Sequence, residues 1–472
     1  MKIIVSNIIQ INKPSHEIVN YCKKELTFRN PEYFKKQQMG FSIYKTPKYI
    51  SLYDFDEDFD SVYLPVGCLQ DIKNLHPNES DYGDFRVTQP RNITSNINLR
   101  SYQEPVVTAV KEMCNGIVLM MCGGGKTESC LATAAELKQH TLFIAHTKDL
   151  VNQAKERCEK NLNCTTSLIT DGKVDLSGDI VFATVQTLHK KLFEIPQDAF
   201  GFVVCDECHK IAANADSVGM FRTCMDYFAA KYKLGLTATL HRADGLEVCI
   251  PKIVGDVIYE IKEDGSDYVG VYKGEELVRF AKNQFQVPVK VNFIKTNYQI
   301  QDAYGNFRDV FDKSGMTISF SKLLTDLAND KERNDMIVDV CKAQSGSTII
   351  LSDRVDQLKY FATKIPNSVQ IDGNTKVNLR EQAMEDVKCG KKQVLLASYK
   401  LAKEGLDCKI LENVIFATPI KDEAIVIQSI GRAQRPFGDK TLAKVFDFVD
   451  DVSTLNRFYT KRRSVYKRKD WL

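Results

Sequence analysis

The sequence lacks the features of several protein classes. Among its 472 residues no apolar run approaches the roughly 18 that a membrane-spanning helix needs, so we predict no membrane span. Its 14 cysteines have no regular spacing and no secretion signal precedes them, which favours reduced thiols in a cytoplasmic protein over a disulfide framework. Asn7 and Gln10 interrupt the apolar start, so we expect Met1–Val5 to be an edge strand rather than a signal peptide.

The charge balance excludes little, because a net charge of +3 can hide local patches. Acidic residues gather between Asp54 and Asp60, where we expect a solvated hairpin loop. Basic residues gather at Lys461–Arg463 and Lys467–Lys469, beside aromatic side chains. This basic cluster fits a phosphate-binding surface or merely a solvated helix end, and the sequence does not decide between the two.

Hydrophobic patterning divides the chain into three parts. Residues 1–95 carry short β-type runs separated by turn-rich stretches and predict a small α+β domain. Residues 96–265 and 266–472 carry short apolar runs that alternate with amphipathic helices, as in parallel sheets covered by helices on both faces. The predicted fold class is therefore α/β, with two tandem parallel-sheet lobes after a small α+β domain. The runs are Gly116–Met120, Thr141–Ala145, Ile180–Ala183 and Phe202–Cys205, then Ser347–Leu351, Gln393–Ala397, Asn413–Ala417 and Ala443–Phe446.

A glycine-rich loop lies between the first of these runs and a predicted helix from Glu128 to Lys138. Glycines let backbone N–H groups curl around phosphate oxygens, and a helix N-terminus adds partial positive charge. Lys126 would contact the β- and γ-phosphates of ATP, and the Thr127 hydroxyl would ligate Mg²⁺. The full phosphate-loop pattern has glycine where Met120 stands, so an ordinary strand-to-helix turn is the alternative. Nucleotide contacts are expected from Cys122, Gly123, Gly124, Gly125, Lys126, Thr127 and Glu128.

Two acids end the buried run Phe202–Cys205. Asp206 would hold Mg²⁺ beside Thr127, and Glu207 would orient the attacking water as a general base. Cys205 and Cys208 also spell C-x-x-C, but structural zinc takes four ligands and no partner pair lies nearby in the sequence. We interpret both cysteines as packing residues and expect no zinc.

Gln428, Arg432 and Arg435 recur at i, i+4 and i+7 of a predicted helix, which places them on one face. Two guanidinium groups on one face can straddle a triphosphate, as arginine fingers do. A solvated basic face is the alternative, although the apolar neighbours Ile427 and Ile430 favour a packed helix.

Taken in order, these elements resemble the motifs of superfamily-two helicases. Asp206-Glu207-Cys208-His209 resembles the DExH box, and Leu99–Gln103 resembles the adenine-reading segment, with contacts from Arg100 and Gln103. The resemblance implies two RecA-like lobes that use ATP and Mg²⁺ and bind nucleic acid. It assigns the coupling of hydrolysis to nucleic-acid grip to His209, Thr237 and Thr239, and it matches Gly405 and Asp407 to motif five. Implied nucleic-acid contacts are His146, Thr147, Lys148, Gln153, Thr184 and Gln186 in the first lobe, and Ser352, Arg354 and Ser398 in the second.

Finer features resemble one branch of the superfamily. Thr239–Gly245 and Lys400–Asp407 are similar to the XPB and UvsW group of DNA translocases, and Asn30–Tyr33 resembles the leading domain of UvsW-like enzymes of T5-type tailed phages. This implies a DNA helicase of the host cytoplasm that remodels branched or forked duplex during replication, recombination or repair, with other such proteins as partners. Residues 1–95 would recognise the junction, and a chain beginning near Gln89 would fold without them. The alternatives are an RNA-remodelling DExH helicase and the translocation subunit of a restriction-type complex.

Overall fold

The computed structural model describes residues 1–121, 123–211, 219–242, 244–263, 268–273, 276–281, 285–301, 308–312, 317–404 and 408–472. The chain forms two compact units, which are described separately below. Unit 1 comprises Met1–Glu263 and Gly270–Arg279, and unit 2 is built mainly from Phe280–Leu472. The domain boundaries at 95 and 265 stay predictions.

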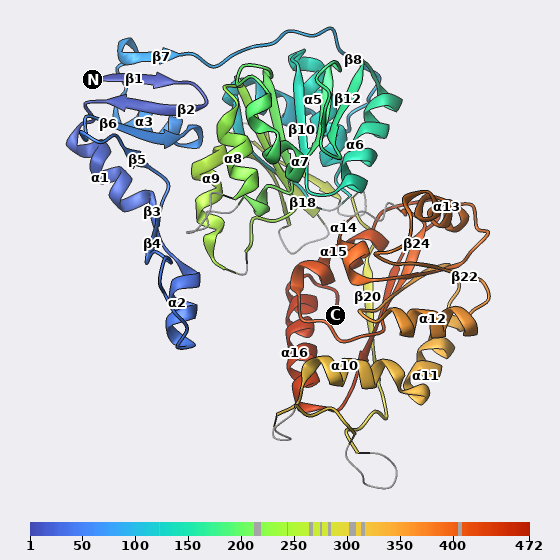
Figure 1. Ribbon diagram of the computed structural model, residues 1–472. Coiled ribbons are helices and arrows are strands. Elements are labelled where there is room, and N and C mark those ends of the chain that lie inside the picture. The colour runs from blue at the N-terminus through green and yellow to red at the C-terminus, as the bar shows by residue number, and fades with distance from the viewer. Residues whose placement is uncertain are drawn as a thin grey trace. The chain divides into compact units, whose positions relative to one another are not determined.

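Unit 1 begins with a five-stranded sheet in the order β5-β6-β2-β1-β7, shown in blue in Figure 1. Its strands are β5 (Asp54–Phe55), β6 (Ser61–Pro65), β2 (Ile8–Asn12), β1 (Lys2–Val5) and β7 (Tyr82–Asp84), accompanied by helices α1 (His16–Glu25) and α3 (Leu69–Leu75). The antiparallel pair β5 and β6 confirms the hairpin around the acidic loop. The edge-strand prediction for Met1–Val5 is wrong, because β1 pairs antiparallel with β2 and parallel with β7.

A projecting segment interrupts this small domain between α1 and β5. Its base is the antiparallel pair β3 (Thr27–Arg29) and β4 (Tyr49–Ser51), and it carries helix α2 (Pro31–Gln38) away from the five-stranded sheet (Figure 1). Asn30 caps α2 by accepting from the Glu32 N–H, and its amide donates to the carbonyl of Pro47. We call Thr27–Ser51 the arm.

The large sheet of unit 1 has the order β13-β12-β14-β10-β15-β16-β9-β17-β18-β19. Neighbouring strands from β12 to β17 run parallel. Alternate residues of a strand face opposite sides, so both Ile144 and Phe143 of β10 are buried, and a continuous apolar run results. The strands are β9 (Asn115–Leu119), β10 (Thr141–Ala145), β12 (Thr166–Thr170), β13 (Lys173–Val174), β14 (Ile180–Thr184), β15 (Phe202–Asp206), β16 (Tyr232–Thr237), β17 (Val257–Glu263), β18 (Tyr268–Lys273) and β19 (Glu276–Ala281). The helices are α4 (Glu104–Met113), α5 (Lys126–Leu137), α6 (Lys148–Asn161), α7 (Val185–Lys190), α8 (Met220–Tyr227) and α9 (Cys249–Val254).

The small sheet and the large sheet of unit 1 share one apolar core. The same cluster of buried side chains includes Ile3 and Leu64 from the small sheet and Ile250 and Val254 from α9. A Cβ atom at Gly67 would lie 2.6 Å from the carbonyl oxygen of Lys252, so the two parts approach at backbone contact. Removing the first 88 residues would expose this core, so the expectation that a chain beginning near Gln89 folds alone is revised.

Unit 2 is a six-stranded parallel sheet in the order β20-β25-β24-β21-β23-β22. Ile349 and Ile350 of β21 belong to separate apolar cores on its two faces. This confirms the predicted α/β fold of two tandem parallel-sheet lobes. The strands are β20 (Val289–Lys295), β21 (Ser347–Leu351), β22 (Ser368–Ile371), β23 (Val394–Ala397), β24 (Leu411–Phe416) and β25 (Ala443–Val449). The helices are α10 (Phe320–Asn329), α11 (Lys331–Lys342), α12 (Val355–Lys364), α13 (Val377–Lys388), α14 (Tyr399–Glu404), α15 (Glu423–Ala433) and α16 (Ser453–Arg468).

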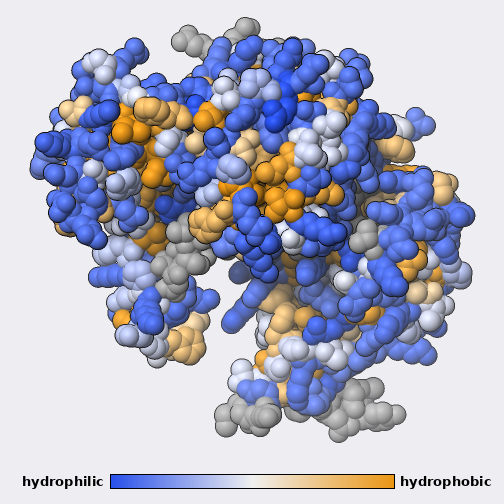
Figure 2. Space-filling view, turned by 45° about the horizontal axis from the view of Figure 1, so that its top comes forward, coloured by the Kyte–Doolittle hydropathy of each residue, from blue (hydrophilic) through white to orange (hydrophobic). Residues whose placement is uncertain are grey.

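Hydrophilic side chains predominate on the face shown in Figure 2, and apolar ones gather there in a few patches. Within the described parts of the chain, no helix is both long enough and apolar enough to cross a bilayer.

Candidate nucleotide and nucleic-acid site

The predicted site residues of unit 1 lie at one edge of its large sheet. The parallel register pairs Thr237 with Leu119, Leu236 with Asp206, and Ala145 with Thr184. Parallel strands that end in register present their carboxyl ends, and the loops after them, at the same edge. The glycine-rich loop after β9, the acids at the end of β15 and the segments after β10 and β14 therefore share one edge.

The glycine-rich loop leads directly into α5. Gly123 and Gly125 have φ of 85° and 88°, a left-handed conformation that glycine adopts without a steric cost. A Cβ atom at Gly124 would lie 2.5 Å from the Cγ of Met120, so that position is also confined to glycine. The Lys126 ammonium donates to the Met120 carbonyl oxygen at 3.1 Å. The loop thus places left-handed glycines and a cation at a helix N-terminus, which is the chemistry of an anion site.

The segment Arg100–Gln103 braces this loop. The Gln103 side-chain amide donates to the carbonyls of Gly124 and Gly125, at 3.2 and 3.3 Å, and its oxygen accepts from the Arg100 N–H. The Tyr102 hydroxyl donates to Gly124 O and accepts from Arg100 Nη1. Gln103 is therefore engaged with the phosphate loop, and its contact with the adenine base stays a prediction.

Asp206 and Glu207 end β15 with different electrostatic environments. Burial and the neighbouring Glu207 charge raise the pKa of Asp206. Burial opposes ionisation of Glu207 as well, but the His209 hydrogen bond and the Lys126 charge lower the pKa of Glu207. Glu207 has a left-handed backbone, with φ of 56°, which turns its side chain away from the strand direction. The pair therefore separates into a carboxyl with a lowered pKa, Glu207, and a carboxyl with a raised pKa, Asp206.

His209 and Thr237 connect Glu207 to the next strand. His209 Nδ1 lies 3.1 Å from Glu207 Oε2 and 3.0 Å from Thr237 Oγ1, and Thr237 Oγ1 lies 3.4 Å from Glu207 Oε2. Thr237 also donates to the carbonyl of Thr239 at 2.8 Å. Arg242 donates to the His209 carbonyl at 2.6 Å and pairs with Asp244. The three residues predicted for coupling thus form one hydrogen-bonded group with the predicted base.

Cys205 and Cys208 are both buried. A Cβ atom at Gly235 would lie 2.9 Å from Cys208 Sγ, so this thiol packs on the neighbouring strand. No cluster of three or more candidate metal ligands occurs within the described ranges of the chain.

The predicted nucleic-acid contacts of unit 1 lie after β10 and β14. Thr147 caps α6 by accepting from the Leu150 N–H, and Gln186 donates to the His146 carbonyl at 3.0 Å. Lys148 is half exposed and pairs with Asp171. Gln153 lies on α6, Thr184 ends β14, and Glu128 of the nucleotide set pairs with Arg157.

In unit 2, Ser352 and Ser398 follow β21 and β23 at the carboxyl edge of the sheet. Ser352 is fully buried, and its hydroxyl donates to Gln357 at 2.7 Å and accepts from the Arg354 N–H. Arg354 donates to the Ser321 carbonyl on α10. Ser352 thus orients the chain near Arg354 from a buried position. Cys122, Gly405 and Asp407 lie outside the described residues.

The predicted arginine fingers differ in their setting. Gln428 and Arg432 lie on α15, and Arg432 Nε donates to the Ala402 carbonyl at 2.6 Å. The helix ends at Ala433, with Gln434 as its C-cap, so Arg435 lies beyond it and the i+7 position of the predicted helix is not realised. Gln434 instead anchors this turn, donating to Gln286 and lying 3% exposed.

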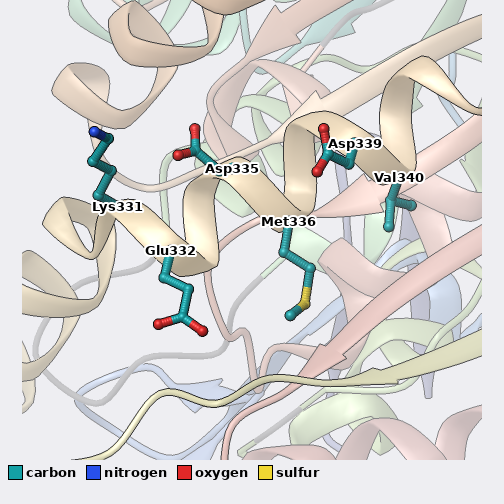
Figure 3. A pocket seen from close by; sticks show the side chains of 6 residues that line it. All are labelled: Lys331, Glu332, Asp335, Met336, Asp339 and Val340. Atoms are coloured by element: carbon teal, nitrogen blue, oxygen red, sulfur yellow. The ribbon is translucent and has the colours of Figure 1, made fainter. Parts of the chain in front are cut away.

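A separate depression of about 680 Å³ lies along α11 (Figure 3). Its lining includes the carboxylates of Glu332, Asp335 and Asp339, and Asp335 accepts from the Tyr360 hydroxyl. Such an acidic lining disfavours phosphate, so the depression is not a nucleotide site.

Three residues that contribute to the site were not assigned a role there from the sequence. Met120 stands at a position where glycine was expected, yet its carbonyl receives Lys126. Tyr102 holds the loop through its hydroxyl, and Arg242 ties the loop after β16 to His209. Met120 was noted only as a departure from the phosphate-loop pattern, while Tyr102 and Arg242 stand inside the selected segments Leu99–Gln103 and Thr239–Gly245.

Comparisons with known proteins agree with this geometry. Residues 96–242 match the family model for the res subunit of type III restriction enzymes, and residues 332–436 match the helicase conserved C-terminal domain. "Putative ATP-dependent RNA helicase L396" of Acanthamoeba polyphaga mimivirus is 26% identical over 98% of this chain and 84% of its own length. "Probable helicase D10" of Escherichia phage T5 is 23% identical over 100% and 95%, respectively.

A solved structure shares the fold. The Pyrococcus furiosus Hef helicase domain aligns with a TM-score of 0.51 and 16% identity, covering 77% of this chain and 98% of its own. The two family models together match more than half of the chain, one in each parallel-sheet unit. The chain belongs to the superfamily-two helicases, a group of ATP-hydrolysing enzymes, and its two sheets are their RecA-like lobes.

Proposed function

We propose that this chain hydrolyses ATP with the residues at the sheet edge of unit 1 and uses the energy to remodel branched DNA. The observation that carries the first part is the hydrogen-bonded group of Glu207, His209 and Thr237 beside a glycine-rich loop with Lys126. An ionised carboxylate next to an anion-binding loop can accept a proton from an attacking water at Glu207 Oε1, since Oε2 faces His209 and Thr237.

The residues fit ATP and Mg²⁺, which helicases of this family use. Added Cβ atoms at Gly124 and Gly125 would meet the side chains of Met120 and Gln103 at 2.5 and 2.1 Å, so neither position has room for a side chain of its own. Asp206, whose pKa is raised by burial and by the neighbouring Glu207 charge, would ligate the cation together with Thr127. When bound, Mg²⁺·ATP would supply the phosphoanhydride bond that is hydrolysed and a cation that neutralises phosphate charge. Lys126 would neutralise the β- and γ-phosphates, and Gln103 would hold the loop in place.

Arg432 and Arg435 would act on the same triphosphate as arginine fingers, with Gln428 beside them. Arg432 is positioned by its hydrogen bond to the carbonyl of Ala402 on α14, three residues before Gly405. Arg435 follows the end of α15, so it is oriented by the turn and not by the helix. The two arginines are therefore expected to contribute differently.

DNA is the favoured nucleic acid. The phage T5 relative is matched along nearly its whole length, and a "DNA 3'-5' translocase XPB2" of Sulfurisphaera tokodaii is 24% identical over 73% of this chain and 80% of its own. We assign strand contact to the segments after β10 and β14 in unit 1 and to Arg354 and Ser398 in unit 2. The buried hydroxyl of Ser352 would act by holding Arg354.

The arm is the feature that favours branched DNA. Its residues between Met39 and Tyr49 expose several large apolar side chains, including Phe41 at 65% and Tyr44 at 81%. Lys45 and Lys48 lie over the rings of Tyr44 and Tyr49, so cations and aromatic faces alternate. Alternating rings and cations suit unpaired bases and their phosphates, which a junction offers and a linear duplex does not.

The base of the arm lies across a cavity from residues that are hydrogen-bonded to the ATP site. Phe28, Arg29 and Phe34 of the arm line a cavity of about 380 Å³ with Asp244–Leu246. Asp244 pairs with Arg242, which donates to the carbonyl of His209. A change at Glu207 and His209 on hydrolysis would thus have a short hydrogen-bonded route to Asp244, which faces the arm across this cavity.

An RNA-remodelling activity is the second candidate, favoured by the mimivirus relative described as an RNA helicase. A translocation subunit of a restriction complex is the third. An EcoAI type I restriction endonuclease subunit of Escherichia coli is 24% identical over 76% of this chain, but the match spans 46% of that protein.

One experiment separates these candidates. ATP turnover is measured with single-stranded DNA, linear duplex, a four-way junction and RNA as stimulators, and strand exchange at the junction is followed in parallel with Glu207→Gln as the inactive control. Stimulation strongest with the junction, together with ATP-dependent strand exchange, supports the proposal. Stimulation by RNA alone would replace it with the second candidate, and equal stimulation by every duplex without strand exchange would favour the third.

A further inference from the structure

We infer that the exposed face of α16 binds the phosphate backbone of duplex DNA, as an additional surface outside the helicase motifs. The inference rests on the proposed function in one respect, that DNA is the ligand. It answers the question that the sequence left open, whether the basic C-terminal cluster binds phosphate or is only a solvated helix end.

The helix is held in a fixed rotation by one buried basic residue. Arg462 is 2% exposed, and its Nε and Nη2 donate to the Asp447 carboxylate at 2.8 and 2.7 Å. Its Nη1 donates to the Ile420 carbonyl, and the Tyr466 hydroxyl also donates to Asp447. Such a bidentate pair fixes geometry as well as charge. Arg462 is therefore unavailable to a ligand. With Arg462 buried, the other basic side chains of α16 lie on the solvent-exposed side of the helix.

The opposite side is basic along its length. Arg457, Lys461, Arg463 and Lys467 are exposed and form no ion pair with another described residue. The helix sequence contains no acidic residue, and the side chains between these cations on the exposed face are the hydroxyls of Ser453, Thr460 and Ser464. Cations interleaved with hydroxyl donors are the groups that contact DNA phosphates.

Neighbouring carboxylates do not cancel this charge. Asp451 precedes the helix and accepts from Asn456, while Asp470 follows the helix. Glu423 pairs with Arg468 at the last turn. The acidic depression of unit 2 lies on another helix, α11. The four unpaired cations of α16 therefore present a surface of one sign to solvent.

The face adjoins the predicted strand contact of unit 2. The Phe458 ring lies 5.0 Å from the ring of Phe320, and the next residue, Ser321, accepts from Arg354 through its carbonyl. The Lys421 ammonium lies 5.4 Å from the centre of the Phe458 ring. Phe458, the residue after Arg457, and Arg354 therefore both contact the start of α10. Nucleic acid held by Arg354 would reach α16 without leaving the surface of unit 2.

The length of the face suits a duplex. Arg457 and Arg468 are separated by about 16 Å along the helix axis at ~1.5 Å per residue. One DNA strand presents a phosphate about every 3.4 Å along the duplex axis, so the face spans about five phosphates. A helix lying along one strand could therefore pair each exposed cation with a different phosphate.

The test compares two triple variants that lose the same charge. One replaces α16 cations, Lys461→Gln, Arg463→Gln and Lys467→Gln. The control replaces exposed lysines of α12 and α13, Lys359→Gln, Lys364→Gln and Lys388→Gln.

Affinity for a linear duplex is measured by fluorescence anisotropy from about 50 to 200 mM KCl, a range over which phosphate contacts change affinity strongly. We expect the slope of log K against log salt to shrink by about two to three for the α16 variant, with Kd at least ~10-fold weaker at low salt. The Kd of the control variant should stay within about twofold of the wild-type value, because exposed charges away from the bound DNA add little to affinity.

The outcomes are distinguishable. If wild-type protein neither binds DNA nor is stimulated by it, the proposed function fails and the inference fails with it. If wild-type protein binds DNA and the α16 variant keeps the slope of the control, only the inference fails, and α16 is a solvated helix. Melting temperatures of both variants report folding. The single variant Lys467→Gln, expected to lower the slope by about one, decides the question if the triple variant does not fold.

Discussion

The ammonium of Lys126 donates a hydrogen bond to the carbonyl oxygen of Met120, 3.1 Å away, so Lys126 is hydrogen-bonded to the segment that precedes its own loop. A bound phosphate must take the place of that carbonyl. Lys126→Met keeps most of the apolar stem and removes the charge. Loss of a charged hydrogen bond of about 1.5–3 kcal/mol should raise the Kd for ATP roughly 10- to 100-fold.

Fluorescent-nucleotide titration measures that Kd. Lys138→Met, at the exposed C-terminal end of the same helix, serves as the matched control. Unchanged ATP affinity in Lys126→Met would mean that Lys126 does not leave the Met120 carbonyl.

Glu207→Gln should preserve ATP binding and lower turnover at least ~100-fold, the scale of general-base loss. The amide keeps the hydrogen-bonding shape toward His209 and Thr237 but cannot take a proton from water. Single-turnover ATP hydrolysis is the measurement, and Glu194→Gln, an exposed residue paired with Lys191, is the control. Near-normal turnover would assign the base elsewhere.

Arg435→Ala should lower DNA-stimulated turnover more than it weakens ATP binding, because a finger acts on the charge that develops during phosphoryl transfer. Arg432→Ala should do so as well and should additionally lower the melting temperature, since Arg432 Nε bonds to the Ala402 carbonyl inside unit 2. Steady-state kinetics with and without DNA, combined with thermal denaturation, separates the two. Equal losses in binding and turnover would indicate ordinary ground-state contacts.

Phe41→Ser combined with Tyr44→Ser should reduce the preference for a four-way junction over linear duplex. Stacking on an aromatic side chain contributes about 1–3 kcal/mol per base, so loss of even one stacked base should lower the preference roughly 5- to 150-fold. Competition binding between the two DNAs measures it. Phe193→Ser removes an aromatic ring that is 90% exposed elsewhere in unit 1 and should leave the preference intact. An unaltered preference in the arm variant would refute the stacking role.

Lys233 gives a pH-dependent prediction. It is 2% exposed, its ammonium donates to the carbonyls of Met225 and Asn7, and burial lowers the pKa of Lys233 to about 8. Between that pKa and the ordinary value near 10.5 the unfolded chain binds the proton and the folded chain does not. The free energy of unfolding should therefore rise with pH across this window through Lys233, by up to about 3 kcal/mol.

Lys233→Met should remove that rise. Urea denaturation from about pH 7 to 10 gives the free energy of unfolding of both proteins. The difference between the two isolates the contribution of Lys233, because the other titrating groups cancel. Lys190→Met, at an exposed position, is the control. A wild-type minus variant difference that stays flat with pH would show that Lys233 keeps its charge when folded.

Much of the fold could be predicted because parallel strands buried on both faces read as short continuous apolar runs. Thr141–Ala145 and Ser347–Leu351 were predicted with the bounds that β10 and β21 have. The site followed from the same logic, since the carboxyl ends of parallel strands meet at one edge and bring Lys126 and Glu207 into the same neighbourhood. The residue roles assigned there stay predictions.

What could not be predicted depends on contacts between distant segments. The interior place of β1 results from its pairing with β7, some eighty residues on, and no local pattern encodes that partner. Local signals were also missed. Arg435 precedes Pro436, and the residue before a proline disfavours the helical backbone, which explains why α15 ends before Arg435.

The core shared by the small sheet and α9 has a consequence for biosynthesis. Ile3 and Leu64 leave the ribosome early, but Ile250 and Val254, which complete their burial, follow almost two hundred residues after Leu64. At about 5–20 residues per second the nascent small domain keeps an apolar face open for roughly 10 to 40 seconds. During that interval the face is open to chaperones and to other nascent chains. The yield of active protein should therefore respond to translation speed between Gly67 and Val254 more than to speed anywhere in unit 2.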